Sequence, residues 1–242
     1  MPFSGERVRT AVKERLYPLA ARYYRASKAS PTGLLRLLGI ADPSYAPNFY
    51  TLAHVVRSGV ADGALIAECG VYRGSTLLGM AHALKNSGVR DWQLVGFDSF
   101  EGFPEPTPAD ARGDGSLHPA ASKGNFADSS FERLRRGIRA LGFENRVTLV
   151  KGFFEDTLPA WSDRRFSLVH LDCDLYQSYK TCLEFFYPRT NAGGAIVFDE
   201  YDHCKNVYPG AQRAIDEFFS DKPERIQALP GSPVPRYFVI KR

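Results

Sequence analysis

Short runs of consecutive apolar residues recur along the chain from about residue 63, and each has the length of a buried strand. Helix-like stretches lie between most of them, at residues 74–88, 129–143 and 178–190. Strand and helix in alternation are typical of a mainly parallel sheet covered by helices on both faces. We therefore predict a doubly wound α/β fold. The predicted strands lie within residues 64–70, 92–100, 146–154, 166–174 and 194–202.

The two ends of the chain depart from this alternation. Residues 223–242 hold two strand candidates joined by a turn rich in Gly and Pro, which predicts an antiparallel hairpin at the end of the sheet. Near the other end, apolar residues recur at helical spacing from Val8 to Ala20, which predicts an amphipathic helix. We expect residues 1–62 to form a helical cap and residues 63–242 one domain. The apolar face of the cap could also serve as a contact in a homodimer.

Residues 103–130 interrupt the domain with a segment rich in Pro, Gly, Asp and Ser. A segment of this length after a strand is either a functional lid or a mobile insertion. We expect a lid that closes over a substrate together with the N-terminal helix. His118 lies in this segment and is best interpreted as a solvated loop residue. His203 lies further along the chain and is best interpreted as structural.

Composition and charge narrow the class of protein. Hydrophobic residues make up 44% of the chain and charged residues 24%, as in an ordinary globular domain with a substantial core. The formal net charge is +4, and no basic stripe is interleaved with aromatic residues, so we expect no nucleic-acid partner. Four scattered cysteines without a CxxC pair indicate free thiols in a reducing cytoplasm. No apolar run has the length of a membrane span.

The first predicted strand ends at Glu68 and is followed by the turn "CGVYRGST". Gly70 and Gly74 permit a tight turn, and Ser75 or Thr76 can cap the following helix. Asp98 ends the second strand, where an acid can accept hydrogen bonds from ribose hydroxyls in a nucleotide-binding sheet. Helix–sheet packing would explain the glycines and an N-cap would explain Asp98, but together they favour an adenosine-type cofactor.

Four acids follow two further strands. Asp172 and Asp174 end one strand and Asp199 and Glu200 end the next, so they should meet if the two strands are neighbours. Alternation places Asp172 and Asp174 on one face, provided that the strand continues that far. Clustered carboxylates repel one another unless a cation lies between them, and a set of oxygen ligands suits Mg²⁺. Helix caps and solvated loop acids are the alternative interpretation.

Several motifs resemble the macrocin O-methyltransferase family in order and spacing. They are "AECGVYRGST", "FDSFEGFPEP", "VKGFFEDTLP", "HLDCDLYQSYKTCLEFFYPRTNAGGAIVFDEY" and "YPGAQRAIDEFF", and the resemblance covers roughly residues 63–219. The resemblance implies a class I, Rossmann-like enzyme that transfers a methyl group from S-adenosylmethionine to a sugar hydroxyl of a natural product. Its acceptor would therefore be a hydroxylated small molecule, either a sugar or a glycoside.

The resemblance also implies roles for individual residues. Asp174 would be the general base, and Asp172, Asp199 and Glu200 would hold Mg²⁺ or another hard divalent cation. The family usually has two aspartates where this chain has Asp199 and Glu200, and the longer side chain of Glu200 moves its carboxylate. The implied cofactor-binding residues are Glu68, Gly70, Tyr72, Ser75, Asp98, Ser99, Phe100, Glu101, Gly102, Gly152 and Phe153.

Two other functions stay open from the sequence. Tyr176 and Lys180 form a YxxxK pair downstream of a glycine turn, as in short-chain NAD(P)-dependent dehydrogenases, although Tyr176 directly follows a strand and no partner serine ends a strand upstream. A non-catalytic protein that retains the methyltransferase fold is the second alternative, because Glu200 departs from the family pattern.

Overall fold

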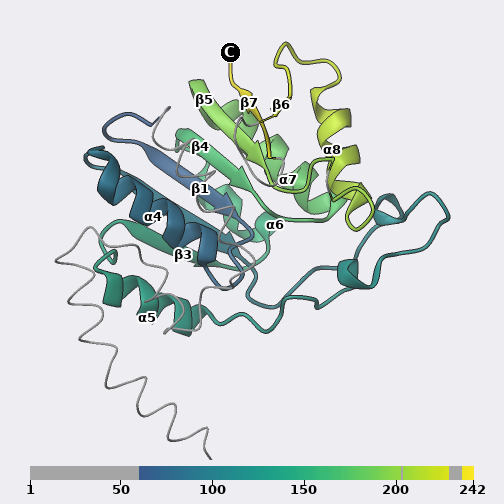
Figure 1. The fold of residues 1–242 in the computed structure, drawn as a ribbon, viewed down its shortest axis with the longest axis horizontal. Helices are drawn as coiled ribbons and strands as arrows, with labels where there is room; N and C mark the ends of the chain where they lie inside the picture. Colours follow the sequence, from purple (N-terminus) through teal and green to yellow (C-terminus); the bar gives the residue numbers. More distant parts are fainter. Residues whose placement is uncertain (1–59, 203, 229–235) are drawn as a thin grey trace, which may run out of the picture.

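A computed structural model describes residues 60–202, 204–228 and 236–242, and these form one sheet with helices on both faces (Figure 1). The strand order is β3-β2-β1-β4-β5-β7-β6. The pairs among β1 to β5 are parallel, whereas β7 pairs antiparallel with both β5 and β6. The predicted doubly wound sheet and its antiparallel C-terminal pair are therefore confirmed. The predicted N-terminal helix, His203 and the turn of the hairpin lie outside the described residues.

The strands are short, and the innermost ones are buried along almost their whole length. Such strands read as continuous apolar runs, which is why they could be located from the sequence. The strands are β1 (Leu65–Cys69), β2 (Gln93–Asp98), β3 (Val147–Lys151), β4 (Phe166–Leu171), β5 (Thr190–Phe198), β6 (Gln227–Ala228) and β7 (Tyr237–Ile240). The helices are α4 (Ser75–Ser87), α5 (Phe131–Leu141), α6 (Phe154–Thr157), α7 (Tyr176–Phe186) and α8 (Pro209–Phe219).

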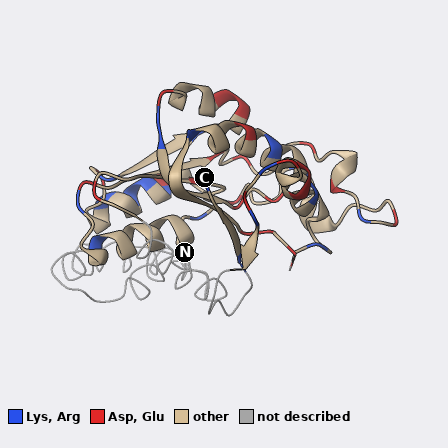
Figure 2. Cartoon of the chain, turned by 90° about the horizontal axis from the view of Figure 1, so that it is seen from above, with Lys and Arg blue, Asp and Glu red and all other residues tan. Residues whose placement is uncertain are grey.

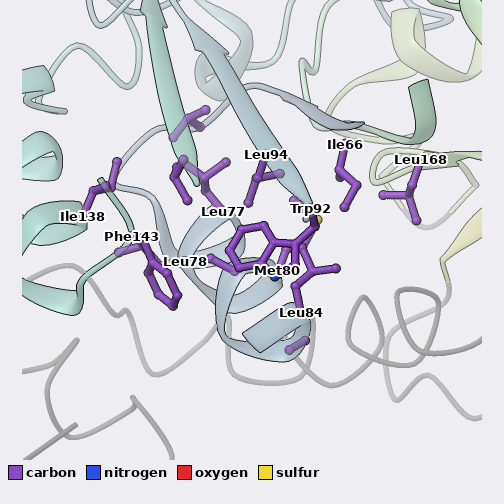
Figure 3. Close-up of a cluster of buried hydrophobic side chains, with 14 of the residues drawn as sticks. Ile66, Leu77, Leu78, Met80, Leu84, Trp92, Leu94, Ile138, Phe143 and Leu168 are labelled. Atoms are coloured by element: carbon purple, nitrogen blue, oxygen red, sulfur yellow. The ribbon is translucent and has the colours of Figure 1, made fainter. Parts of the chain in front are cut away.

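Helices α4 and α5 cover one face of the sheet. Leu77, Leu78 and Leu84 of α4 are fully buried, and Figure 3 shows them in one cluster with the strand residues Ile66 and Leu94. A side chain of this size contributes about 1.5–3 kcal/mol when it is fully buried. This layer therefore fixes α4, and with it the turn that leads from β1 into α4.

Helices α7 and α8 cover the other face (Figure 1). Tyr179, Leu183 and Phe186 of α7 are buried against the strands, and Ala214 and Ile215 of α8 belong to the same cluster. The phenol of Tyr179 is the exception to this apolar layer, because its hydroxyl donates a hydrogen bond to the Leu171 carbonyl at the end of β4 (2.9 Å).

The segment of residues 103–130 extends from the sheet beside α8 (Figure 1) and is held in place by hydrogen bonds. Asp110 is 1% exposed, and its Oδ1 accepts a hydrogen bond from the backbone N–H of Tyr176 at the start of α7 (2.7 Å). Arg213 of α8 donates to the Ala109 carbonyl (2.6 Å). The part of the segment around Asp110 is thus a fixed wall against α7 and α8, and closure of the rest stays a prediction.

Charged residues of both signs are interleaved over the described elements (Figure 2). Within the described ranges, no helix combines the length and the apolar character that crossing a membrane requires. All four cysteines are free thiols.

Candidate active site

The carboxyl ends of β1, β2, β4 and β5 open into a cavity of about 300 Å³. Ligands of open α/β sheets bind at this edge, because there the chain leaves each strand and its loop residues face the same space. The residues that line the cavity are Gly70, Val71, Tyr72, Arg73, Ser75, Thr76, Asp98, Ser99, Gly102, Phe103, Pro104, Phe126, Gly152, Phe153, Phe154, Glu155, Asp172, Cys173, Asp174, Ser178, Asp199, Cys204, Tyr208 and Arg236.

The turn after β1 contacts the chain that leaves β4. Gly70 has φ +87°, and a Cβ placed there would lie 1.6 Å from the carbonyl oxygen of Asp172. The backbone N–H of Gly70 donates to the Phe97 carbonyl of β2 (2.9 Å). Glycine is therefore required at residue 70 both for its backbone conformation and for the close approach of the two loops.

Asp98 connects the turn after β1 to the turn after β2. Its Oδ2 accepts hydrogen bonds from the backbone N–H groups of Val71 and Tyr72 (2.8 Å each), and its Oδ1 accepts one from Phe100 (2.6 Å). A carboxylate has about four acceptor positions, so three are used by the backbone and one is left for a ligand hydroxyl. Asp98 thus lines the cavity and also carries a structural role that the sequence did not reveal.

Most residues predicted to bind the cofactor line the cavity, but three lie elsewhere. Glu68 is fully buried inside the sheet, Phe100 packs against Phe131 with their ring centroids 5.3 Å apart, and Glu101 pairs with Lys151 at 3.4 Å. The predicted residues that do line the cavity are Gly70, Tyr72, Ser75, Asp98, Ser99, Gly102, Gly152 and Phe153.

The acids at the ends of β4 and β5 converge, although not by strand alternation. Strand β4 ends at Leu171, and Asp174 has φ +60°, so the premise that the strand continues to Asp174 was wrong. Instead the chain turns after Asp172, and both acids still line the cavity. The backbone N–H of Asp199 donates to the Leu171 carbonyl (2.9 Å), which keeps the end of β5 beside the end of β4.

Two sets of side chains bring possible ligand atoms within 4.8 Å of one another: His170, Asp172 and Asp199, and Asp172, Asp174 and Glu200. Burial, then the charge of Asp199, raises the pKa of Asp172 to about 6. Burial, then neighbouring carboxylates, raises the pKa values of Asp174 and Glu200 well above their usual range. The second set therefore consists of three buried carboxyl groups whose mutual repulsion disfavours their charged forms, and a hard divalent cation between them would offset that repulsion.

Glu200 belongs to this set but is not among the residues that line the cavity. Glu200 is 2% exposed, and its Oε2 lies 2.7 Å from the Tyr179 hydroxyl, whose one proton is shared between this oxygen and the Leu171 carbonyl. The backbone N–H of Asp174 lies 3.3 Å from the same oxygen. The longer side chain at residue 200 is thus accommodated by contacts that direct it toward Asp172 and Asp174.

The buried side chain of His170 lies next to Asp199. His170 Nδ1 is 3.1 Å from Glu68 Oε1, and its Nε2 is 3.6 Å from Asp199 Oδ1. Burial alone would lower the pKa of His170, but Asp199 and Glu68 outweigh burial and raise it to about 10. Burial raises the pKa of Glu68 to about 7 against the opposing effect of His170. Arg236 Nε lies 2.6 Å from Asp199 Oδ1, so Asp199 faces two cations.

The outer wall of the cavity is aromatic. Tyr72, Phe126, Phe103 and Tyr208 make consecutive edge-to-face contacts, with ring centroids 5.1, 5.1 and 6.2 Å apart. Phe103 and Phe126 come from the two ends of the 103–130 segment. Of these four residues the sequence pointed only to Tyr72; Phe103 and Phe126 were missed because their segment has no periodic pattern, and no motif singled out Tyr208.

The residues of the dehydrogenase alternative lie outside the cavity. The Tyr176 hydroxyl donates to Glu217 (2.6 Å), and Lys180 Nζ lies 5.5 Å from the centre of the Tyr176 ring. Neither residue lines the cavity, so the cavity gives no support to that alternative. His118 also lies elsewhere, where its Nδ1 accepts a hydrogen bond from the Ala120 N–H (3.0 Å).

The strand order, the glycine turn after β1 and the acid at the end of β2 are those of the class I methyltransferase fold. A sequence profile of the macrocin-O-methyltransferase (TylF) family matches residues 48–227. The chain therefore belongs to the macrocin-O-methyltransferase family and is an S-adenosylmethionine-dependent O-methyltransferase.

Relatives and solved structures agree with this assignment. The chain is 31% identical over 71% of its length to an 8-demethyl-8-(2,3-dimethoxy-alpha-L-rhamnosyl)-tetracenomycin-C 4'-O-methyltransferase of Streptomyces olivaceus, and the match covers 70% of that protein. It is 29% identical over 69% of its length to a mycinamicin III 3''-O-methyltransferase of Micromonospora griseorubida, of which the match covers 65%. In fold it resembles the O-methyltransferase NovP (TM-score 0.65, 23% identity, 81% of this chain and 79% of that one). CalS11, a calicheamicin methyltransferase, is similar (TM-score 0.65, 24% identity, 99% and 94%).

Proposed function

We propose that this enzyme methylates a hydroxyl of a sugar or glycosylated natural product, with the help of Mg²⁺ or a similar divalent cation. The observation that carries the proposal is the position of the acids: Asp172 and Asp174 line the same cavity as the glycine turn and Asp98. A nucleotide-type donor and a deprotonated hydroxyl would therefore meet there. The relatives named for rhamnosyl-tetracenomycin and mycinamicin support the choice of acceptor class.

The cofactor would occupy the side of the cavity formed by β1 and β2. Gly70 and the turn behind it leave room for a ligand close to the backbone, and the remaining acceptor position of Asp98 suits a ribose hydroxyl. Gly152 and Phe153 line the cavity at the end of β3 and would lie near the adenine. Most of the catalytic advantage comes from alignment, because the sulfonium methyl group is already electrophilic.

Asp174 is the proposed general base. It lines the cavity, and the pKa of its carboxyl lies well above the usual range because of burial and the charge of Asp172. A base with a raised pKa accepts a proton from an alcohol more readily than an ordinary carboxylate does. The backbone of Asp174, in the left-handed region, would direct its side chain toward the acceptor.

The carboxylates of Asp172, Asp174, Asp199 and Glu200 are the residues that could hold the divalent cation. Such an ion lowers the pKa of a hydroxyl that binds to it and is worth several kcal/mol as a Lewis acid. The aromatic wall of Tyr72, Phe126, Phe103 and Tyr208 would pack against the apolar faces of a sugar ring or aglycone and exclude water.

An acceptor screen tests the proposal. The protein would be incubated with methyl-labelled S-adenosylmethionine and a panel of glycosides, with Mg²⁺ or with a chelator. We expect label in at least one glycoside, on oxygen, and loss of transfer with the chelator. Cofactor binding without transfer to any hydroxylated acceptor would contradict the proposal and favour the non-catalytic alternative.

A further inference from the structure

Asp110 is a buried acid in a segment, residues 103–130, whose other acids are exposed. It is 1% exposed and lies at the end of a single 3₁₀ turn, Pro108–Asp110. Its Oδ2 accepts hydrogen bonds from the N–H (2.8 Å) and the hydroxyl (2.9 Å) of Thr107. Burying a carboxylate is costly unless its oxygens are hydrogen-bonded, so the partners of the second oxygen, Oδ1, matter as well.

The Oδ1 of Asp110 binds the start of α7. The first N–H groups of a helix have no partner within the helix, and Leu175, the residue before α7, has no side chain that could accept from them. Asp110 supplies the acceptor, because the Tyr176 N–H donates to its Oδ1 (2.7 Å). A carboxylate is also favoured at this end of a helix by the helix dipole. Asp110 therefore fixes the start of α7, just after Asp174.

Helix α8 packs against the same carboxylate through Gly210. Gly210 is buried in the first turn of α8, and a Cβ placed there would clash with Asp110 Oδ1 and would lie 2.9 Å from the Cβ of Tyr176. Gly210 has no positive φ, so glycine is needed here for space and not for its backbone conformation. The starts of α7 and α8 thus meet around one side chain of the 103–130 segment.

The residues that lead into these two helices line the cavity. Asp174 precedes α7 and Tyr208 precedes α8. The Tyr208 hydroxyl donates a hydrogen bond to the Asp174 carboxylate, and its ring packs edge-to-face on Phe103 with their centroids 6.2 Å apart. The proposed base and one part of the aromatic wall are therefore attached to the two helix starts that Asp110 joins.

We propose that Asp110 is a positioning residue for methyl transfer: its buried carboxylate joins the starts of α7 and α8, and so holds Asp174 and Tyr208 in place around the acceptor. The inference rests on the proposed function, in which Asp174 takes the proton of the acceptor hydroxyl. Asp110 touches neither substrate nor cofactor and acts through the helix starts.

The cofactor side of the cavity is held by other contacts. Asp98 ties the turns after β1 and β2 together through backbone N–H groups. Where the 103–130 segment leaves the sheet, its two ends are joined by the Phe103 N–H, which donates to the Asn125 carbonyl (3.0 Å). Loss of the Asp110 carboxylate should therefore disturb the acceptor side and spare the binding of S-adenosylmethionine.

The test compares the two substrates in Asp110→Ala. Steady-state kinetics would use methyl-labelled S-adenosylmethionine with the best acceptor of the glycoside panel, and isothermal titration would give the Kd of S-adenosylmethionine. We expect kcat/KM for the acceptor to fall about 10²-fold, as for a displacement of about 1 Å in a catalytic constellation. The Kd of S-adenosylmethionine should stay within about threefold of the wild type.

Asp114→Ala is the matched control in the same segment. Asp114 is exposed and accepts hydrogen bonds from the N–H (2.9 Å) and the hydroxyl (2.7 Å) of Ser116, so its loss also removes two hydrogen bonds to a carboxylate. These contacts stay within the segment and do not reach α7 or α8. Both the acceptor kinetics and the cofactor affinity of this variant should stay within about threefold of the wild type.

Gly210→Ala reaches the same junction from α8 and leaves the carboxylate in place. Alanine favours a helix more than glycine does, so a loss in this variant must come from the clash. We expect the same contrast between acceptor and cofactor. The double variant, Asp110→Ala with Gly210→Ala, should fall no further than Asp110→Ala alone, because the clash with Oδ1 needs the carboxylate. Independent structural effects of the two changes would instead add.

Two results would overturn the inference and leave the proposed function intact. One is a parallel loss of acceptor kinetics and cofactor affinity in Asp110→Ala, and the other is unchanged acceptor kinetics in that variant. If Asp110→Ala does not fold, Gly210→Ala decides by the same comparison. A wild type that transfers the methyl group to no glycoside would contradict the proposed function, and the inference with it.

Discussion

Substitution of Gly70 by alanine should disable the site by moving two loops at once. The added Cβ would lie 1.6 Å from the Asp172 carbonyl oxygen, whereas real Cβ contacts are essentially never shorter than 3.0 Å. The turn after β1 and the chain after β4 must therefore separate by about 1.4 Å. A displacement of about 1 Å in a catalytic constellation can cost about 10²-fold in rate. We expect kcat/KM of Gly70→Ala to fall at least that far, with weaker binding of S-adenosylmethionine.

Gly88→Ala is the matched control. Gly88 has φ +86°, almost the same as the +87° of Gly70, but a Cβ there would meet nothing within 4 Å. Both variants carry the strain of an L-residue in this region, about 1–2 kcal/mol, and only Gly70→Ala carries the clash. Isothermal titration with S-adenosylmethionine, steady-state kinetics and thermal melting separate the two effects. Equal cofactor affinity and turnover in the two variants would refute the reasoning.

Three further changes test other parts of the site. Asp174→Asn should retain cofactor affinity but lose about 10²–10⁴-fold in turnover, as expected for loss of a general base, and near-normal turnover would exclude that role. Asp98→Asn places an amide where three backbone N–H groups need an acceptor. Chemical denaturation should show that the free energy of unfolding falls by about 1–3 kcal/mol. Asp91→Asn, at an exposed residue, is the control and should change it by less than about 0.5 kcal/mol. Because the pKa of Asp172 is raised to about 6, protons compete with a metal for this carboxylate below that pH. Mn²⁺ affinity should therefore fall about tenfold per pH unit for each proton displaced. An affinity that stays constant from pH 8 to pH 5 would contradict the raised pKa.

The layered fold was predictable because its signal is local. A strand buried on both faces is mainly apolar, and the run from Phe166 to Leu171 fits this rule apart from Ser167 and His170. Helix α5 likewise begins where Ser130 caps it and ends at Gly142 in the left-handed region. The meeting of the acids followed from topology, since consecutive parallel strands are commonly neighbours.

The remainder of the site depends on long-range register and on irregular chain. Arg236 comes to Asp199 only because β7 inserts beside β5 with Tyr237 opposite Phe198, and no local pattern fixes that pairing. Phe103 and Phe126 come from a segment without periodicity. Glu68 lies within its strand and not at its end, so its side chain is fully buried against His170 and does not reach the cavity.

The claim that the carboxylates and the methyl donor share one site is tested most directly by the distance between a bound metal and the transferable methyl group. The protein would be saturated with S-adenosylmethionine labelled with ¹³C at the sulfonium methyl, and Mn²⁺ would be added while the methyl resonance is recorded. Strong paramagnetic broadening of that resonance in the wild type, and its absence in Asp172→Asn, is the result expected here. A methyl signal that stays sharp while both cofactor and Mn²⁺ are bound to the wild type would contradict a shared site.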